Sequence, residues 1–375
     1  MIKSLDAITY NLSILDERNH KVNTALSTKE ALEYGSDDSI KYSYIISLQG
    51  DINSYSSIQD NITLSKAFNS SSDSALKEAK DVTDEIIAKL IEANTDTTAD
   101  EDREVIATEL EDSKNVLLSL ANTKVNGQYL FSGINTDTKP FVTDSVTGQT
   151  SYQSDNSTKT LNVEKATYVS QGVNGIDAFY YENAAVGSTD TFTFSANEKI
   201  LDPEGNEWQL IDSGGGVYEL YLNGDTSSTP ISVTDNGDGT FTATNSTSST
   251  LSVQHSIFDA LDEVIAALKL QDTDGNTISS AAARDLISTG IDNIKSAYDS
   301  QNIAHSTVGS RTAAINTYND VVSSKLTNLK SLEEEYAGAD LTALAIESKA
   351  LENTYTALYS TINRMNNMSL VNFLS

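Results

Sequence analysis

Apolar residues recur at alternating spacings of three and four over the last stretch of the chain, residues 341–374. Such a heptad pattern predicts a long helix whose apolar stripe packs against another helix along its length. No Pro interrupts this stretch, and no Gly falls inside it. We predict one helix with a charge-free apolar tail and assign its contact positions to Leu341, Leu344, Leu351, Tyr355, Leu358, Ile362, Met365, Leu370 and Phe373.

The N-terminus carries a matching pattern, in which Asn19 is the one polar member. A single polar residue at a heptad contact position can fix the register between two helices at some cost in stability. We predict that the two terminal stripes pair, because only the ends of the chain lack a neighbouring helix of their own kind. The contact positions on this side are Leu5, Ile8, Leu12, Leu15, Val22 and Leu26.

Helical spacing continues after the N-terminal stripe. We expect Gly35 to break the first helix and Ser36 or Asp37 to cap the next one. The serine-rich run Asn69–Ser74 is predicted to kink or restart that second helix.

A long apolar pattern runs in unbroken phase from Ile287 to Leu329. It would form roughly 60 Å of helix, which suits a rod better than a globule. On periodicity alone an ordinary helical bundle remains an alternative. The phase slips at Gly338, which we expect to end this helix, and Asp340 can cap the terminal one.

The pattern changes from helical to alternating between residues 141 and 254. Thr, Ser, Gly, Tyr and Phe dominate, and short runs such as Thr191–Phe194 are separated by turn clusters such as Asn236–Gly239. Closely spaced turn signals predict an all-β module. Asn126-Gly127, just before it, predicts a tight hairpin, because both residue types accept positive φ. The single Trp, Trp208, is expected in the core of the module.

The elements therefore nest around the β module. We predict the α+β class, with long paired terminal helices and a helical rod domain that carries an inserted all-β outer domain. The predicted boundaries are 1–35 with 340–375 for the terminal coiled-coil assembly region, 36–140 with 255–339 for the rod domain, and 141–254 for the inserted domain.

Composition removes several function classes. The chain has 54 acidic and 24 basic residues, a formal net charge of −30, so we expect neither nucleic acid nor an anionic membrane as a partner. It has no Cys, and no apolar run approaches membrane-spanning length. The N-terminus lacks the apolar core of a cleaved signal peptide. We expect a cytoplasmic protein, or one that leaves the cell by a route that reads no such peptide.

Candidate chemistry is sparse. The three histidines, His20, His255 and His305, form no zinc-binding motif. The Asp272–Asn276 turn fails the register of a calcium loop, which requires Gly at its sixth position and Glu at its twelfth. We assign no catalytic, cofactor-binding or metal-binding residue and predict that the protein is not an enzyme.

Four segments resemble the bacterial flagellin family. Leu26-Ser27-Thr28 with Gly35–Ser39 is similar to the segment after the family's first helix, and Asp102–Leu110 is similar to a later helix start. Ala121–Gly133 resembles the family's Asn-Gly hairpin, and the ending Ser369–Leu374 resembles the members that join hook to filament. In this chain Lys29-Glu30-Ala31 replaces the usual Gly-Lys/Arg after Leu-Ser-Thr, so the geometry of that turn is left open.

The resemblance implies a structural adaptor between flagellar hook and filament, secreted by the flagellar export apparatus and located at the hook-filament junction. Paired terminal helices would polymerise into a ring. The implied partners are further copies of this chain, hook-associated protein 1, flagellin and an export chaperone.

Three alternatives remain at this point. A filament-forming flagellin would use the same terminal helices and polymerise alone into long tubes. An enzyme or a secreted adhesin carried on the β insertion would place the function in residues 141–254, where no catalytic motif supports it.

Overall fold

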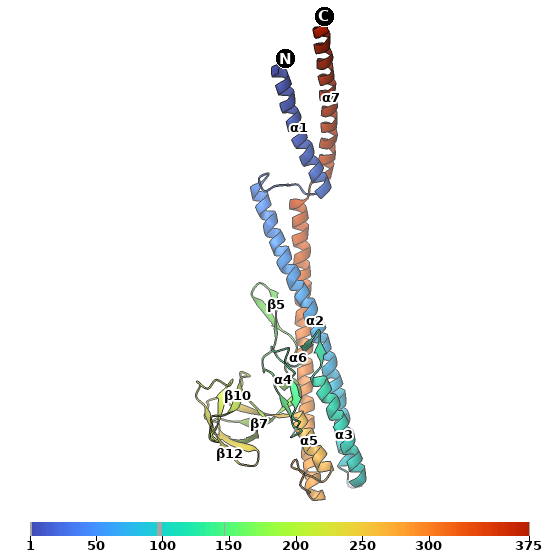
Figure 1. Ribbon diagram of the computed structural model, residues 1–375. Coiled ribbons are helices and arrows are strands. Elements are labelled where there is room, and N and C mark those ends of the chain that lie inside the picture. Colours follow the sequence, from blue (N-terminus) through green and yellow to red (C-terminus); the bar gives the residue numbers. More distant parts are fainter. Residues whose placement is uncertain (1, 96–99, 146, 375) are drawn as a thin grey trace. The chain divides into compact units, whose positions relative to one another are not determined.

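The computed structural model describes the backbone of residues 2–95, 100–145 and 147–374, and the side chains of residues 6–95, 101–145 and 147–364. The chain divides into two compact units, one formed by residues 1–60 with 320–375 and the other by residues 61–319. The long helices α2 (Ser39–Ala93) and α6 (Ser280–Ala337) contribute residues to both units (Figure 1). The predicted α+β class, with long terminal helices and an antiparallel β module between them, is confirmed.

The first unit contains the terminal helices α1 (Ile2–Thr28) and α7 (Leu341–Leu374) together with the adjoining ends of α2 and α6. The predicted start of α7 is confirmed, because Asp340 Oδ1 accepts hydrogen bonds from the backbone N–H groups of Thr342 and Ala343, both at 3.0 Å. These bonds satisfy donors that have no partner within the first turn of a helix.

The predicted cap of α2 was wrong. Asp38, rather than Ser36 or Asp37, accepts the bond from the backbone N–H of Lys41, at 3.0 Å. Asp37 instead closes the preceding turn, where its carboxylate accepts from the Tyr34 N–H at 3.1 Å. The first helix also ends earlier than Gly35, at Thr28, because Lys29 takes a positive φ of 64°.

The predicted restart of the helix at the serine run was also wrong, since α2 is one continuous helix of 55 residues. The hydroxyls of Ser71, Ser72 and Ser74 donate to the carbonyls four residues earlier, at 3.0 to 3.1 Å. A serine hydroxyl that bonds back to the carbonyl four residues earlier can bend a helix slightly, but it leaves the backbone hydrogen bonds of the helix in place. The run is therefore tolerated inside the helix.

The helical part of the second unit is built on one hydrophobic cluster, to which α2, α3 (Asp100–Ala121), α5 (Ile257–Leu268) and α6 contribute. Aromatic rings fill its centre, where the Phe141 ring lies 5.2 to 5.3 Å from those of Tyr152, Phe179 and Phe258. Phe179 ends the short helix α4 (Gly175–Phe179). Edge-to-face rings at such distances add to the stability gained from burying the apolar area itself.

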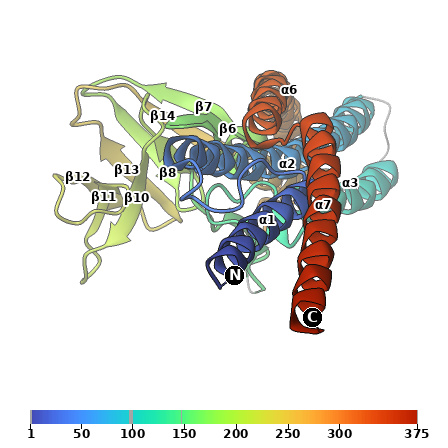
Figure 2. The ribbon, with the colours of Figure 1, turned by 90° about the horizontal axis from the view of Figure 1, so that it is seen from above.

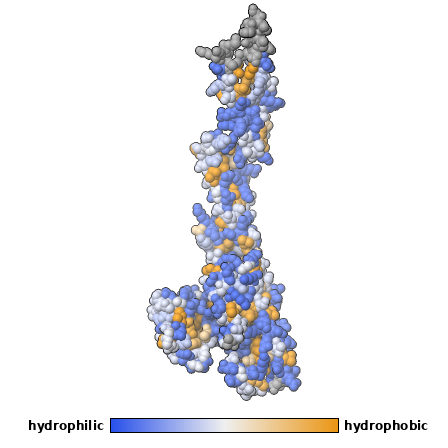
Figure 3. Space-filling model, in the orientation of Figure 1, coloured by the Kyte–Doolittle hydropathy of each residue, from blue (hydrophilic) through white to orange (hydrophobic). Residues whose placement is uncertain are grey.

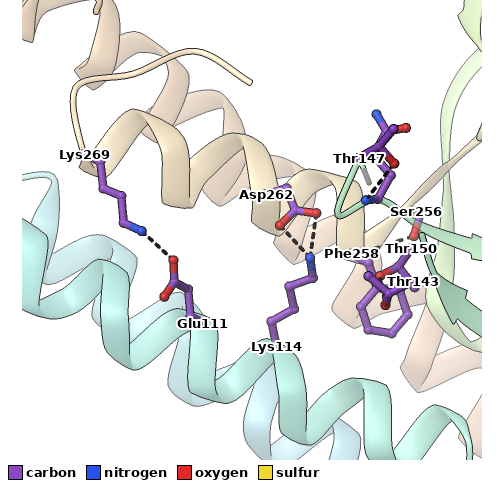
Figure 4. Close-up of polar contacts among 10 residues, drawn as sticks. Glu111, Lys114, Thr143, Thr147, Thr150, Ser256, Phe258, Asp262 and Lys269 are labelled. Atoms are coloured by element: carbon purple, nitrogen blue, oxygen red, sulfur yellow. Dashed lines mark hydrogen bonds and ion pairs between the residues drawn. The ribbon is translucent and has the colours of Figure 1, made fainter. Parts of the chain in front are cut away.

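Ion pairs fasten α5 to α3 beside this cluster (Figure 4). Lys114 Nζ lies 2.6 Å from both carboxylate oxygens of Asp262. Lys269, the residue after α5, places its Nζ 2.5 Å from Oε1 of Glu111, which lies one turn before Lys114 on α3. The side chain of Lys114 is mostly buried, so this pair is shielded from solvent more than a surface pair.

Three short hairpins connect the helices to the sheet. They pair β1 (Lys124–Val125) with β2 (Gln128–Tyr129), β3 (Phe141–Thr143) with β4 (Thr150–Tyr152), and β5 (Thr160–Glu164) with β6 (Thr167–Ser170). The predicted Asn126-Gly127 turn is confirmed, with φ values of 51° and 82°.

The β module is one eight-stranded antiparallel sheet of order β7-β14-β9-β10-β11-β12-β13-β8. Its inward side chains form a second hydrophobic cluster, against which Trp208 packs from a half-buried position rather than from the centre. The strands are β7 (Tyr180–Val186), β8 (Thr191–Ser195), β9 (Lys199–Leu201), β10 (Glu207–Asp212), β11 (Tyr218–Leu222), β12 (Ile231–Asp235), β13 (Thr240–Thr244) and β14 (Leu251–Ser256).

The surface is mainly hydrophilic, with apolar residues scattered among charged and polar ones on the visible face (Figure 3). Within the described ranges, no helix is long and apolar enough to cross a membrane. The described side chains also contain no group of three or more His, Cys, Asp or Glu residues placed to hold a metal ion.

Candidate assembly interface

The terminal helices α1 and α7 lie side by side, with the two chain ends at the same end of the pair (Figures 1 and 2). Two polar links join them. Arg18 Nη2 lies 2.9 Å from Glu347 Oε1, and the Tyr355 hydroxyl donates to Asp16 Oδ1 at 2.5 Å. The lower-numbered partner in α1 meets the higher-numbered one in α7, so the helices are antiparallel.

The link between Tyr355 and Asp16 also changes the chemistry of the tyrosine. The hydrogen bond to the Asp16 carboxylate, with burial adding to it, raises the pKa of Tyr355 above its ordinary value. The phenol therefore stays protonated and remains a donor across the neutral pH range. Sequence analysis missed Asp16, Arg18 and Glu347, because nothing local separates them from the other charged residues of the chain.

A backbone contact holds the helix pair at its other end. The N–H of Ala31 donates to the carbonyl of Ala337 at 2.7 Å, and the N–H of Ala339 donates to the carbonyl of Lys29 at 3.0 Å. These bonds form an antiparallel bridge between Glu30 and Gly338. The turn after α1 is thereby tied to the turn before α7 within the first unit.

Gly338 is required at this bridge. A Cβ atom there would collide with the backbone carbonyl oxygen of Glu334 in the last turn of α6. Because backbone atoms cannot move aside as a flexible side chain can, any other residue would force the turn to change. Sequence analysis identified Gly338 as a helix end, but not as part of a contact with the turn after α1.

Among the predicted contact residues whose side chains are described, two are buried, Val22 at 4% exposure and Leu351 at 6%. Leu341 is 44% exposed. Leu5, Met365, Leu370 and Phe373 lie outside the described side chains. The remaining predicted residues are half-buried on the facing sides of the two helices, namely Ile8, Leu12, Leu15, Leu26, Leu344, Tyr355, Leu358 and Ile362.

Further apolar residues lie on the outer faces of the same two helices. Tyr10 and Ile346 are each 68% exposed, and Tyr359 is 56% exposed with its ring stacked 6.4 Å from that of Tyr355. Heptad analysis missed them, because it selects the stripe that faces the partner helix. Together with the half-buried stripe they leave the helix pair with apolar surface that the chain itself does not cover.

The adjoining ends of α2 and α6 are joined by aromatic contacts in the same unit. The rings of Tyr44 and Tyr336 meet edge to face at 4.7 Å. Lys325 Nζ lies 5.2 Å from the centre of the Tyr55 ring and 3.4 Å from its hydroxyl. Ile40, in the first turn of α2, is 84% exposed.

Two sequence comparisons identify a relationship. Residues 6–136 match the family described as the bacterial flagellin N-terminal helical region. Over 54 residues, the chain is 43% identical to flagellar hook-associated protein 3 of Escherichia coli. That match spans 14% of this chain and 17% of the relative's length.

Solved structures share the fold. The chain matches FlgL of Xanthomonas campestris with a TM-score of 0.51 at 18% identity, covering 74% of this chain and 99% of that one. It matches flagellar hook-associated protein 3 of Legionella pneumophila with a TM-score of 0.54 at 18% identity, covering 78% and 98%. A putative flagellar hook-associated protein from Vibrio parahaemolyticus gives 0.54 at 14% identity, covering 80% and 100%.

Proposed function

We propose that this chain, which carries the N-terminal helical region of the bacterial flagellins and the fold of flagellar hook-associated proteins, joins the flagellar hook to the flagellin filament. Its role would be structural, as it is for the flagellar proteins that it resembles. The chain would act at the flagellum after export, as a ring of identical subunits between hook-associated protein 1 and flagellin. An export chaperone would cover the apolar stripe of α7 before secretion.

The observation that carries this proposal is the incomplete burial of the α1 and α7 pair. A helix pair in water normally buries its apolar stripe, since each buried side chain contributes to stability. Here most of the described stripe is only half-buried, and Tyr10, Ile346 and Tyr359 lie outside it. Packing against the same helices of neighbouring subunits would cover both sets.

The proposed mechanism is coupled folding and assembly. Segments that cannot bury enough apolar surface alone become ordered when a partner covers them. Under this mechanism the predicted assembly region, residues 1–35 with 340–375, supplies the contacts between subunits. The inserted β domain then plays no part in polymerisation.

A filament-forming flagellin is the second candidate, because it would use the same interface. The match to hook-associated protein 3 favours the junction role. Electron microscopy of cells lacking this protein separates the two. The junction role predicts hooks without filaments and flagellin released into the medium, whereas loss of a filament subunit would leave no flagellin to release.

A substitution in α7 tests the assembly interface itself. Leu358→Asp would place a carboxylate in the half-buried stripe, where burial without a partner is costly. We expect it to abolish assembly while the second unit stays folded, as monitored by electron microscopy and by circular dichroism. Ser360→Asp, at an exposed position of the same helix, is the matched control. Normal filaments in cells carrying Leu358→Asp would contradict the proposed interface.

A further inference from the structure

His255 lies where the sheet meets the helical core of the second unit. It is the next-to-last residue of β14, and Ser256 caps α5 by accepting from the Phe258 N–H at 3.2 Å. Leu251 belongs to the hydrophobic cluster of the sheet, whereas Phe258 belongs to that of the helices. His255 is 9% exposed, so a titratable side chain is buried at the joint between two separate cores.

Carboxylates approach both ring nitrogens of His255. Nδ1 lies 3.0 Å from Glu198 Oε1, in the turn between β8 and β9. Nε2 lies 3.7 Å from Glu263 Oε1 on α5. The ring of Tyr181 from β7 packs edge to face against the imidazole, with ring centres 5.5 Å apart. The histidine thus contacts both the sheet and α5.

Glu198 is held in place by the sheet and not only by the histidine. Its Oε2 accepts from the Ser195 N–H at 2.8 Å, and its Oε1 accepts from the Asn183 side-chain amide at 3.3 Å. The protonated ring of His255 therefore links Glu198, which is fixed on the sheet, to the Glu263 carboxylate on α5. Without that proton, the imidazole is neutral and its charge attraction to Glu198 and Glu263 is lost.

The surrounding charges favour protonation of this histidine. Burial alone would lower the pKa of His255, but the hydrogen bond and charge of Glu198, with the charges of Glu263 and Asp259, raise it above the ordinary value. Burial also raises the pKa of Asp259 to about 7, with the charges of Asp262 and Glu263 adding to it. Lys114, which is paired with Asp262, opposes this shift because its charge lowers the pKa of Asp259.

We propose that His255, Glu198 and Glu263 form a pH-dependent lock between the eight-stranded sheet and α5, closed when His255 is protonated. The histidine gains its carboxylate partners on folding, so its pKa is higher in the folded chain than in the unfolded one. Its contribution to folding stability is therefore fully present below the unfolded pKa of about 6.5 and is lost as the pH rises through the pKa of the folded chain. This inference is independent of the proposed assembly role.

Hydrogen exchange on the full chain tests the lock. Amide protection in β14 and in the turn between β8 and β9, corrected for the intrinsic pH dependence of exchange, should be higher at about pH 5.5 than at about pH 8.5. Each unit by which the folded pKa of His255 exceeds the unfolded one should change the ratio of closed to open states about tenfold. His255→Gln should remove this dependence, whereas His305→Gln, a histidine on α6, should leave it intact.

Proton NMR of the histidine side chains gives an independent readout that does not require a folding-neutral variant. The midpoint of His255 should lie above the value of about 6.5 for an unperturbed histidine and should fall in Glu198→Gln. A midpoint at or below 6.5 in the native chain, or a pH dependence of protection that persists in His255→Gln, would overturn the proposal.

Discussion

The core of the second unit and the terminal helix pair of the first bury their apolar residues to very different degrees. Phe131, Phe141, Phe179 and Phe258 are all less than 2% exposed. In the terminal pair, only Val22 and Leu351 reach comparable burial among the predicted contact residues with described side chains. The core of the second unit can hold its fold by its own contacts, because little of its apolar surface is left for water or for another chain.

Under the proposed function, this difference separates residues that hold the fold from residues that mediate assembly. Both regions carry apolar residues at helical spacing, so periodicity alone makes them look alike. They differ in how many elements pack against each apolar stripe. Several helices and strands cover the core, whereas each terminal helix has one partner helix. One partner helix can cover only one face of a helix, so apolar residues on the opposite face stay exposed.

The largest expected difference comes from truncating one side chain in each region. Phe258→Ala should lower the free energy of unfolding by about 3–5 kcal/mol, because it removes a fully buried ring and leaves a cavity. Leu358→Ala should change it by less than about 1 kcal/mol in the free chain, because its side chain is only half-buried. Urea denaturation followed by circular dichroism measures both, and equal effects would break the comparison.

Two glycines on α6, Gly290 and Gly309, differ in how closely the core packs around them. A Cβ at Gly290 would collide with a methyl group of Val264 on α5, whereas one at Gly309 would meet no other atom within 4 Å. We expect Gly290→Ala to destabilise the chain by about 1–3 kcal/mol through overpacking. Gly309→Ala should stabilise it by up to about 1 kcal/mol, the ordinary gain in helix propensity. Thermal unfolding of the two variants should therefore shift in opposite directions, and shifts of the same sign would show that α5 and α6 are not closely packed here.

The smallest contrast concerns one ion pair from each region. Lys114→Ala should cost about 1–3 kcal/mol, because it leaves Asp262 partly buried without its cation. Arg18→Ala should cost no more than about 1 kcal/mol, since Arg18 and Glu347 are both exposed. Denaturation midpoints at low and high salt provide the measurement. A larger loss for Arg18→Ala would mean that the terminal pair is more stable in the free chain than its burial suggests.

Much of the helical architecture could be predicted from the sequence, because the long apolar periods are local features. The same holds for the Asn126-Gly127 turn and the Asp340 cap, where the residue type fixes the backbone. The expected restart at the serine run was wrong, because periodicity does not reveal that Ser71 and Ser72 bond back to their own helix. The order of the sheet could not be predicted, since β9 pairs with β14 about 50 residues away in sequence.

The candidate interface could be predicted only in part. The apolar stripes could be read from the sequence, and they predicted that the two terminal helices pair. The links from Asp16 to Tyr355 and from Arg18 to Glu347 depend on how far one helix is shifted along the other, which no local pattern sets. His255 was equally inaccessible, because its carboxylate partners come from β8–β9 and α5, and only the folded chain brings these together.

Limited proteolysis of the free and assembled protein, with the fragments identified by mass spectrometry, tests the central claim most directly. If the terminal helices complete their packing only between subunits, protease should trim both ends of the free chain and leave a core near residues 40–320. The same sites should be protected after assembly. Termini that resist protease in the free chain, at enzyme concentrations that cut elsewhere, would contradict the account.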